Sequence, residues 1–402
     1  MNISRENAWL WFCSIPNLNW QQRTALIQYF GSPQNVFSAE EKDFSLWEKM
    51  GIRWIRKVRE AAGESSFDQA LSRIEKQNVR FISCEHPDFP EKLHQIADSP
   101  HGLFFKGSLP DPHRPAVAVV GSRICSNYGK VIAADLAGHL AAEGIPVISG
   151  MAVGIDGIAQ RSALENGCES YGILGCGADI CYPKQNFDLY WNLCTCGHGG
   201  ILSEYACGTD PYRTNFPWRN RIISALSDAV VVIEARKGSG SLITADYALD
   251  QGKEVYAVPG RCSDERSAGG NLLIRQGAAI YISAEDFIEQ MKQLWSTMSS
   301  YRVSAVKKKQ ESHEPQEKTG GTGISGSSFS DSTLSDSTLS GSAFSDSALC
   351  ILDAMDLEPA DINTLSERTG RSAKEVASVL TQLQLCGRIT EISRNYYAKN
   401  HI

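Results

Sequence analysis

Five residues that suit contact with a nucleic acid gather in one short stretch of the chain, residues 200–227. They are Tyr212, Arg213, Phe216, Arg219 and Arg221. The stretch begins as a strand, breaks into a loop rich in Gly, Pro and Asn, and restarts as a helix. Cationic side chains and an aromatic ring at a helix start suit a phosphate chain that carries stackable bases. A cluster of salt bridges at the start of the helix is the alternative explanation.

The helix of this stretch is predicted to begin at Phe216–Pro217, because proline is favoured in the first turn. Arg219 then shares one helix face with Ile222, Ile223 and Leu226. We therefore expect Arg219 on the buried side of the helix and Arg221 on another side.

Three further loops carry groups that bind anions. Gly121, Ser122 and Arg123 follow an apolar run, and Ser149 and Gly150 lie in a second glycine-rich turn before a helix. A third loop, 175–186, offers Lys184. Each loop is a weak signal alone. Because ligands of open parallel sheets bind outside the carboxyl ends of the strands, we expect all four loops to line one positively charged notch.

The elements that must position these loops alternate regularly between strand and helix. Apolar runs predict strands over 116–121, 146–150, 169–175, 200–204, 228–235 and 254–260. Helical patterns over 127–144, 155–166, 186–194, 217–227 and 241–251 separate them. This alternation predicts an α/β fold, a Rossmann-like parallel sheet over 111–295, with residues 77–110 as an extension of the core.

The rest of the chain divides into three predicted segments. Residues 1–76 form short helices, similar to helix-hairpin-helix or sterile-alpha-motif modules. Residues 296–347 are rich in Ser, Asp, Gly and Thr, which predicts a disordered linker. Residues 348–402 have the pattern of three helices and a β-hairpin, a winged helix. Its predicted recognition helix has one Lys and one Glu, which argues against groove reading and favours a protein-contact or regulatory role.

Composition limits the classes of function. The 402 residues carry a net charge of −7, so any nucleic-acid site must be local. No apolar run is long enough to span a membrane, and we expect a cytoplasmic protein with reduced thiols. Cys194, Cys196 and His198 lack the second ligand pair of a typical zinc site, so we expect no metal.

Motifs of the common enzyme classes on this fold are missing from the sequence. Gly121 does not begin a GxGxxG dinucleotide fingerprint, and there is no GxxxxGK[ST] phosphate loop. Asp156, Asp179, Glu204 and Glu234 lie at the same predicted sheet edge and are candidates for acid–base chemistry. The alternative, which we favour, is that Asp156 and Glu204 hold Arg123 or Arg219 in place.

The chain resembles the DNA-processing protein A (DprA, also called Smf) family. The resemblance rests on VAVVGSR (117–123), SGMAVGID (149–156), GCGADICYPKQN (175–186), SEYACGTDPYRTNFPWRNRIISALS (203–227), KGSGSLITA (237–245) and VYAVPG (255–260). It covers about 180 residues of the predicted Rossmann part, and both end domains look like those of the longer family members.

The resemblance implies a protein without catalysis or cofactor. It would bind single-stranded DNA, protect incoming DNA, form a homodimer and help load the RecA recombinase in natural transformation and homologous recombination. It implies strand contacts for Arg123, Lys184 and Arg213, and base stacking on Phe216. The pocket would further be lined by Gly121, Ser122, Ser149, Gly150, Arg219, Asn220 and Arg221. The dimer or recombinase surface would involve Leu249, Leu273 and Ile274.

The main alternative is a nucleotide-processing enzyme on the same fold, similar to phosphoribohydrolases. Those enzymes carry a PGGxGTxxE signature, whereas the comparable turn here, GSGSLITAD (238–246), lacks the glutamate at that spacing.

Overall fold

The computed structural model describes residues 3–40, 42–43, 58, 60–61, 64–296, 351, 360–385, 389–393 and 396–399. The chain divides into two compact units, Met1–Met291 and Lys292–Ile402, which are described separately below. Within the described residues, no helix is both long and apolar enough to cross a membrane.

The first unit is built on one sheet, in which the described residues form nine strands. Their order is β1-β2-β6-β5-β4-β3-β7-β8-β9. The strands are β1 (Arg80–Ser83), β2 (Gly102–Gly107), β3 (Val117–Gly121), β4 (Val147–Ser149), β5 (Ser170–Ile173), β6 (Gly199–Ser203), β7 (Ala229–Ile233), β8 (Glu254–Ala257) and β9 (Ala279–Ile280). From β6 to β9 every neighbouring pair is parallel, as predicted, whereas β1 and β2 extend the sheet beyond β6 in antiparallel pairing.

The strand order reverses between β3 and β7, which creates a crevice at the carboxyl ends of these strands. The chain passes from β3 outward through β4, β5 and β6, and then returns to place β7 on the other side of β3. The loops after β3, β4, β5, β6 and β7 therefore open toward the same edge of the sheet.

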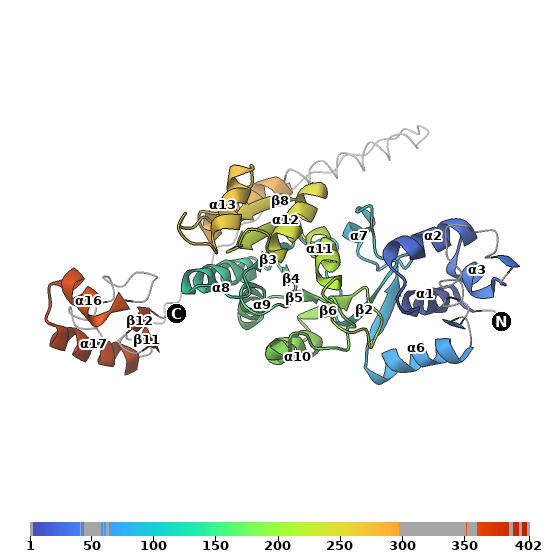
Figure 1. Ribbon diagram of the computed structural model, residues 1–402, viewed down its shortest axis with the longest axis horizontal. Helices are drawn as coiled ribbons and strands as arrows, with labels where there is room; N and C mark the ends of the chain where they lie inside the picture. Colours follow the sequence, from blue (N-terminus) through green and yellow to red (C-terminus); the bar gives the residue numbers. More distant parts are fainter. Residues whose placement is uncertain are drawn as a thin grey trace, which may run out of the picture. The chain divides into compact units, whose positions relative to one another are not determined.

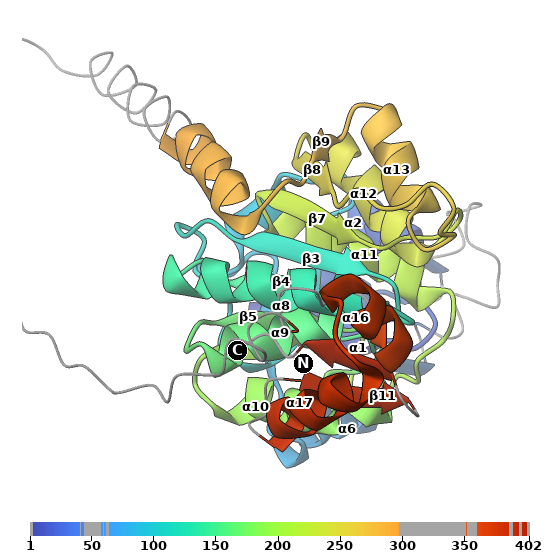
Figure 2. The same cartoon turned by 90° about the vertical axis from the view of Figure 1, so that its left-hand side faces the viewer.

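Helices cover both faces of the sheet (Figures 1 and 2). One face carries α8 (Asn127–Ala142), α9 (Ile155–Glu165) and α10 (Phe187–Thr195), and the other carries α7 (Glu91–His94), α11 (Asn215–Leu226) and α12 (Gly240–Asp250). Next to β8 lies α13 (Ala268–Arg275), and a further helix spans 284–296. Strands covered on both faces need apolar side chains at every position, and all five residues of β7 are buried.

The N-terminal helices share a hydrophobic core with one face of this sheet. They are α1 (Arg5–Ser14), α2 (Trp20–Phe30), α3 (Pro33–Ser38) and α6 (Glu64–Lys76). Trp9, Trp11 and Phe12 of α1 belong to the same buried cluster as Phe104 of β2 and Leu189 of α10. The N-terminal helices are thus packed onto the sheet within the first unit. Residues 44–57 of the predicted helical segment 1–76 lie outside the described residues.

The second unit contains β10 (Ala360–Asp361), α16 (Ile362–Thr369), α17 (Ala373–Leu385), β11 (Ile389–Ser393) and β12 (Tyr396–Lys399). The strands pair in the order β10-β12-β11, and β11 and β12 form the predicted hairpin. Its core consists of Ile351, Leu365, Val376, Leu380, Leu383 and Ile389. The first of the three predicted helices lies almost entirely outside the described residues.

Candidate nucleic-acid interface

The turn after β3 brings Arg123 to the rim of the crevice. Gly121 ends the strand so close to the carbonyl oxygen of Ile233 on β7 that a Cβ atom would collide with it. Only glycine permits this approach, and the following Ser122 closes the turn by donating its hydroxyl to Ile124 O at 2.9 Å. Arg123 then projects as an exposed side chain.

The turn after β4 lies beneath a buried charged pair. A Cβ atom on Gly150 would lie 2.8 Å from Nη2 of Arg219 and 2.9 Å from Oδ2 of Asp156, so both side chains lie over this glycine. The Gly150 N–H donates to Asp156 at 3.1 Å, and Arg219 donates to Gly150 O at 3.2 Å. Arg219 is therefore held in a fixed position at the floor of the crevice.

Burial shifts the pKa values of this pair in opposite directions. It raises the pKa of Asp156 and lowers that of Arg219 to about 10, while the charge of each partner opposes the shift of the other. Arg219 therefore stays protonated at neutral pH, with the carboxyl group of Asp156 beside it.

Phe216 provides an aromatic ring beside these cations. It lies over Gly175, where a Cβ atom would be 2.9 Å from the ring. Its ring centroid is 5.3 Å from that of Tyr182, and the guanidinium of Arg219 lies 5.8 Å from its centre. The helix that carries Phe216 begins at Asn215 rather than at the predicted Phe216, so Pro217 is its third residue.

The helix α11 is also more deeply buried than its sequence pattern predicts. Every residue from Arg219 to Leu226 is buried, including polar side chains on the side away from Ile222 and Ile223. The reason is that α11 packs between the sheet, α7 and α12.

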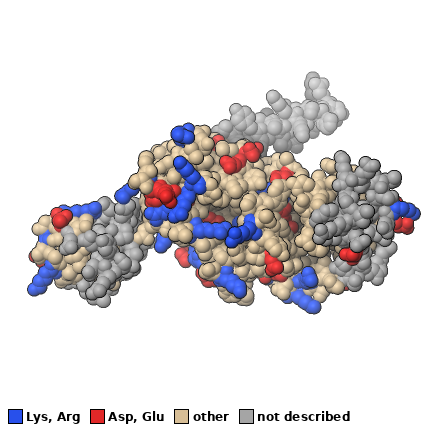
Figure 3. Space-filling view, in the orientation of Figure 1, with Lys and Arg blue, Asp and Glu red and all other residues tan. Residues whose placement is uncertain are grey.

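These loops enclose two contiguous cavities of 920 and 520 Å³, which we call the strand-end cavity. Both are lined by Arg123, Ala152, Tyr182, Phe216 and Arg219. Lys184 lines the larger one, and Arg213 and Asn220 line the smaller one. Among the described residues that line it, five are cationic (Arg123, Lys184, Arg213, Arg219 and Arg236) and one, Asp156, is acidic. The positive lining is local in a chain of net charge −7, and Figure 3 shows basic side chains gathered across the middle of the visible face.

Two of the predicted pocket residues lie elsewhere. Ser149 is fully buried at the end of β4, where its hydroxyl donates to Val119 O at 2.6 Å. Arg221 is also fully buried, and its Nη1 and Nη2 donate to both carboxylate oxygens of Glu204 at 2.8 and 2.7 Å. Positions two apart on a helix do not face the same side, so Arg219 and Arg221 cannot both line the cavity. Every other predicted strand-contacting or pocket residue lines it.

The carboxylates at this edge have structural partners. Asp156 faces Arg219, as favoured from the sequence, but Glu204 pairs with Arg221 rather than with Arg123 or Arg219. The Glu234 carboxylate accepts the Ser126 N–H at 2.8 Å at the start of α8. Asp179 accepts the N–H of Gly208 at 3.0 Å.

Part of the cavity lining was not predicted from the sequence. Tyr182 lies against Phe216, and Arg236, Ser239, Ser241 and Thr244 come from the turn after β7 and the start of α12. The strand order would have predicted these residues, because β7 lies next to β3 where the order reverses, so the loop after β7 also faces the cavity. The glycine-rich sequence 237–245 has the same strand-turn-helix character as 149–156.

The three residues predicted for a dimer or recombinase surface differ in exposure. Leu249 on α12 is 55% exposed, and Ile274 on α13 is half-buried. Leu273 is buried at 5% and belongs to the core between the sheet and these helices. The role of these three residues in a dimer or recombinase surface stays a prediction, and Leu273 packs inward within this chain.

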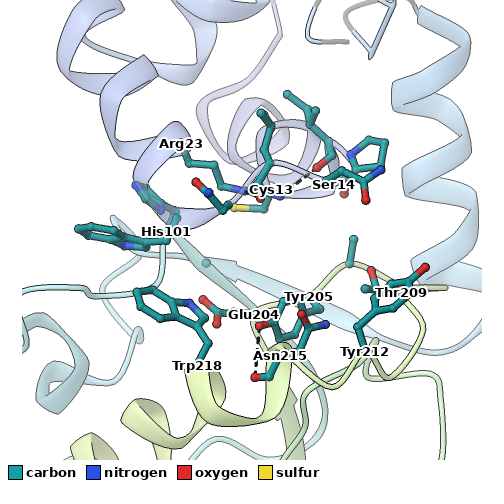
Figure 4. Close-up of a pocket in the computed structure, with 18 of the residues that line it drawn as sticks. Cys13, Ser14, Arg23, His101, Glu204, Tyr205, Thr209, Tyr212, Asn215 and Trp218 are labelled. Atoms are coloured by element: carbon teal, nitrogen blue, oxygen red, sulfur yellow. Dashed lines mark hydrogen bonds between the residues drawn. The ribbon is translucent and has the colours of Figure 1, made fainter. Parts of the chain in front are cut away.

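A separate cavity of 470 Å³ lies between the N-terminal helices and the start of α11 (Figure 4). Trp20, His101, Tyr205, Tyr212 and Trp218 give it aromatic walls. Asn215 and Trp218 face this cavity, whereas Phe216 and Arg219 face the strand-end cavity. The first turn of α11 is thus a wall common to both cavities.

Arg23, which lines this second cavity, makes structural hydrogen bonds. Arg23 donates to the carbonyl oxygens of Phe12, Ile15 and Leu18 at the end of α1, at 2.6, 3.0 and 3.2 Å. It therefore has little capacity left for a phosphate. Among the described residues, no group of three or more His, Cys, Asp and Glu is placed to hold a metal ion.

Comparison with known proteins gives two family matches. Residues 80–292 match the model described as DNA recombination-mediator protein A, and residues 336–393 match the DprA winged helix domain. The second match begins inside the segment predicted as a linker.

Individual relatives agree with these matches. Protein Smf of Escherichia coli K12 is 34% identical over 284 residues, 71% of this chain and 74% of that protein. DNA processing protein DprA of Streptococcus pneumoniae R6 is 40% identical over 224 residues, 55% of this chain and 78% of that protein. The X-ray structure of DprA from Streptococcus pneumoniae superposes with a TM-score of 0.60 at 32% identity, covering 72% of this chain and 98% of that one.

Proposed function

The chain belongs to the DNA recombination-mediator protein A family, and on that premise we propose that its strand-end cavity binds single-stranded DNA. The observation that carries the proposal is the convergence of Arg123, Lys184, Arg213 and Phe216 around one cavity. Exposed cations neutralise phosphates, and an aromatic ring stacks on a base of any type.

Single strands suit this cavity better than duplex DNA. Phe216 is half-buried and lies in the cavity lining, so only an unpaired base can stack on its ring. None of the lining groups requires a particular base, because cations read the backbone and an aromatic face accepts every base. We therefore propose binding that tolerates any sequence.

The proposed role is that of a mediator rather than an enzyme. The carboxylates at the site are engaged with arginines or backbone N–H groups, which supports binding over acid–base chemistry. We propose that the protein protects single strands and passes them to the RecA recombinase in homologous recombination and natural transformation, acting as a homodimer. Membership of the DNA recombination-mediator protein A family supports this role.

Fluorescence anisotropy with a labelled oligothymidine tests the proposal on the full chain. We expect single strands to bind more tightly than a duplex of the same length. Arg123→Gln should weaken binding to all sequences alike, and Ile282→Ala, which alters an exposed side chain at the far sheet edge, should not. Equal binding of wild type and Arg123→Gln, with both folded by thermal melting, would contradict the assignment of this cavity.

RecA loading has its own assay. We expect the protein to speed RecA filament formation on strands covered by a single-strand-binding protein, and Arg123→Gln to reduce that effect. A protein that binds strands but leaves filament formation unchanged would disprove the mediator role alone.

A further inference from the structure

Two large aromatic side chains stand exposed on α10, just outside the strand-end cavity. Phe187 is 58% exposed and Trp191 is 57% exposed. Their ring centroids are 6.4 Å apart and their planes differ by 25°, so the two rings are stacked on each other. Single exposed apolar side chains are common on protein surfaces, but two adjacent exposed rings form a contiguous apolar patch, which is a candidate contact site.

This pair continues a row that begins at the cavity. Lys184 lines the cavity, and the single 3₁₀ turn Lys184–Asn186 leads directly into α10. Side chains three apart in a 3₁₀ turn lie above one another, and side chains four apart share an α-helix face. Lys184, Phe187 and Trp191 therefore follow one another on the outer side of this segment, at steps of about 6 Å along the axis.

The charge along this row does not oppose a polyanion. The one acidic side chain within it, Asp188, is bound through both oxygens by Arg161, each at 2.9 Å. This pairing lowers the pKa of Asp188 to about 2, and Arg161 balances its charge. With Lys184 added, the segment around the two rings carries a net positive charge.

We propose that Phe187 and Trp191 form a second stacking platform for the DNA strand that leaves the strand-end cavity at Lys184. This platform rests on the proposed function and extends it, because it gives the exit path of the strand. The aromatic groups then run from Phe216 and Tyr182 inside the cavity, past Lys184, to Phe187 and Trp191 outside it. Alternating cations and aromatic rings of this kind bind single strands without reading their sequence.

The continuity of the row favours a nucleic acid over a protein partner. A protein-binding hot spot needs a pocket or a rim that excludes water around it. Here Lys184, Gln185 and Asn192, around the rings, are exposed and polar, while the apolar residues of α10, Leu189 and Leu193, point into the core. The platform is thus open along the direction of the strand, as a stacked chain of bases requires.

The test compares a short and a long oligothymidine on the full chain. A strand of about five nucleotides occupies the cavity, whereas one of about fifteen reaches α10 as well. We expect Trp191→Ala to weaken the long strand by about 5- to 150-fold, the range of one lost stacking contact, and to leave the short strand unchanged. Trp191→Phe should restore most of the affinity, because it keeps a stacking face.

Two controls separate the platform from the cavity. Tyr29→Ala removes another aromatic ring, 41% exposed, from the N-terminal helix α2 and should affect neither strand. Phe216→Ala should weaken both strands, which tests the cavity. The quench of tryptophan fluorescence by the long strand should also shrink in Trp191→Phe, although that variant still binds.

Each other outcome overturns the platform. If Trp191→Ala and the double variant with Phe187→Ala bind the long strand like wild type, the rings do not contact DNA. If these substitutions weaken binding of the short strand as much as binding of the long one, the two side chains act through the cavity. If the wild type binds neither strand, the proposed function falls together with the platform.

Discussion

The salt dependence of DNA binding gives a quantitative test of which arginines contact phosphates. Four exposed cations line the strand-end cavity, namely Arg123, Lys184, Arg213 and Arg236, whereas Arg219 is buried beside Asp156. An exposed cation that neutralises a phosphate releases a counterion from the strand. Arg219 already has a carboxylate partner, so it contributes little to this release.

The expected slopes follow from this count. Single-stranded DNA changes log K by about 0.7 per log unit of salt for each neutralised phosphate, so four exposed cations predict a slope of about −2.8. Arg213→Gln should reduce it to about −2.1. Arg219→Gln should weaken binding by moving Phe216 and Gly150 but keep the slope at about −2.8, because the number of exposed cations is unchanged.

The assay is fluorescence anisotropy with oligothymidine over a series of chloride concentrations. Arg213→Gln is expected to fold normally because its side chain is exposed, and a thermal melt checks each variant. Equal slopes for wild type and Arg213→Gln would show that Arg213 touches no phosphate. A slope reduced by Arg219→Gln as much as by Arg213→Gln would refute the division between buried and exposed cations.

Three further predictions concern stacking, packing and pH. Phe216→Ala should remove about 1–3 kcal/mol of binding free energy for every base sequence, as titrations with different homopolymers will show. Phe216→Leu should destabilise the fold less but lose as much of the stacking contribution to binding. Gly150→Ala places a methyl group 2.8 Å from Arg219 Nη2, so it should lower the free energy of unfolding by about 1–3 kcal/mol and weaken DNA binding. As a control, Gly138→Ala in α8 places its methyl group 3.8 Å from the nearest atom and should have neither effect. Urea unfolding measures the stability of both variants. Burial, with a smaller effect of Arg23, lowers the pKa of His101 from 6.5 to about 4, so the unfolded chain alone takes up a proton between these values. Stability should therefore fall by roughly 3 kcal/mol as the pH drops from 6.5 to 4, a loss that His101→Gln should abolish in urea unfolding at several pH values.

Local patterns predicted most of the sheet and the loops at its edge. Each parallel strand from β3 to β8 coincides with an apolar run, because a strand covered on both faces needs apolar residues throughout. The short strand β9 was not predicted, since two residues with partial exposure carry no pattern. The antiparallel pairing of β1 and β2 depends on contacts with β6, far along the chain, which periodicity alone does not reveal.

The cavity lining was predicted less completely than the sheet, because part of it depends on contacts between distant segments. Arg123, Lys184, Arg213 and Phe216 follow strands or begin a helix, so the edge rule locates them. The burial of Arg221 depends on Glu204 and Asp98, residues from two distant segments, and on Trp218, whose ring lies 4.4 Å from its guanidinium. Such pairings form only when the elements pack together, so they cannot be predicted from the sequence without the strand order.

The division between fixed and exposed cations would let the proposed DNA site accept any base sequence while its floor stays ordered. Arg219 and Phe216 are held by Asp156, Gly150, Gly175 and Tyr182, so the floor of the cavity needs little rearrangement when a base stacks on it. The exposed side chains of Arg123, Lys184 and Arg213 remain free to follow backbones of different shape. A fixed ring would accept any base, and flexible cations would accept any backbone geometry, so both parts would contribute affinity without selecting a sequence. If all the cations were fixed, the cavity would favour one backbone geometry. If the ring were free to move, the entropy lost in ordering it would reduce the free energy gained from stacking.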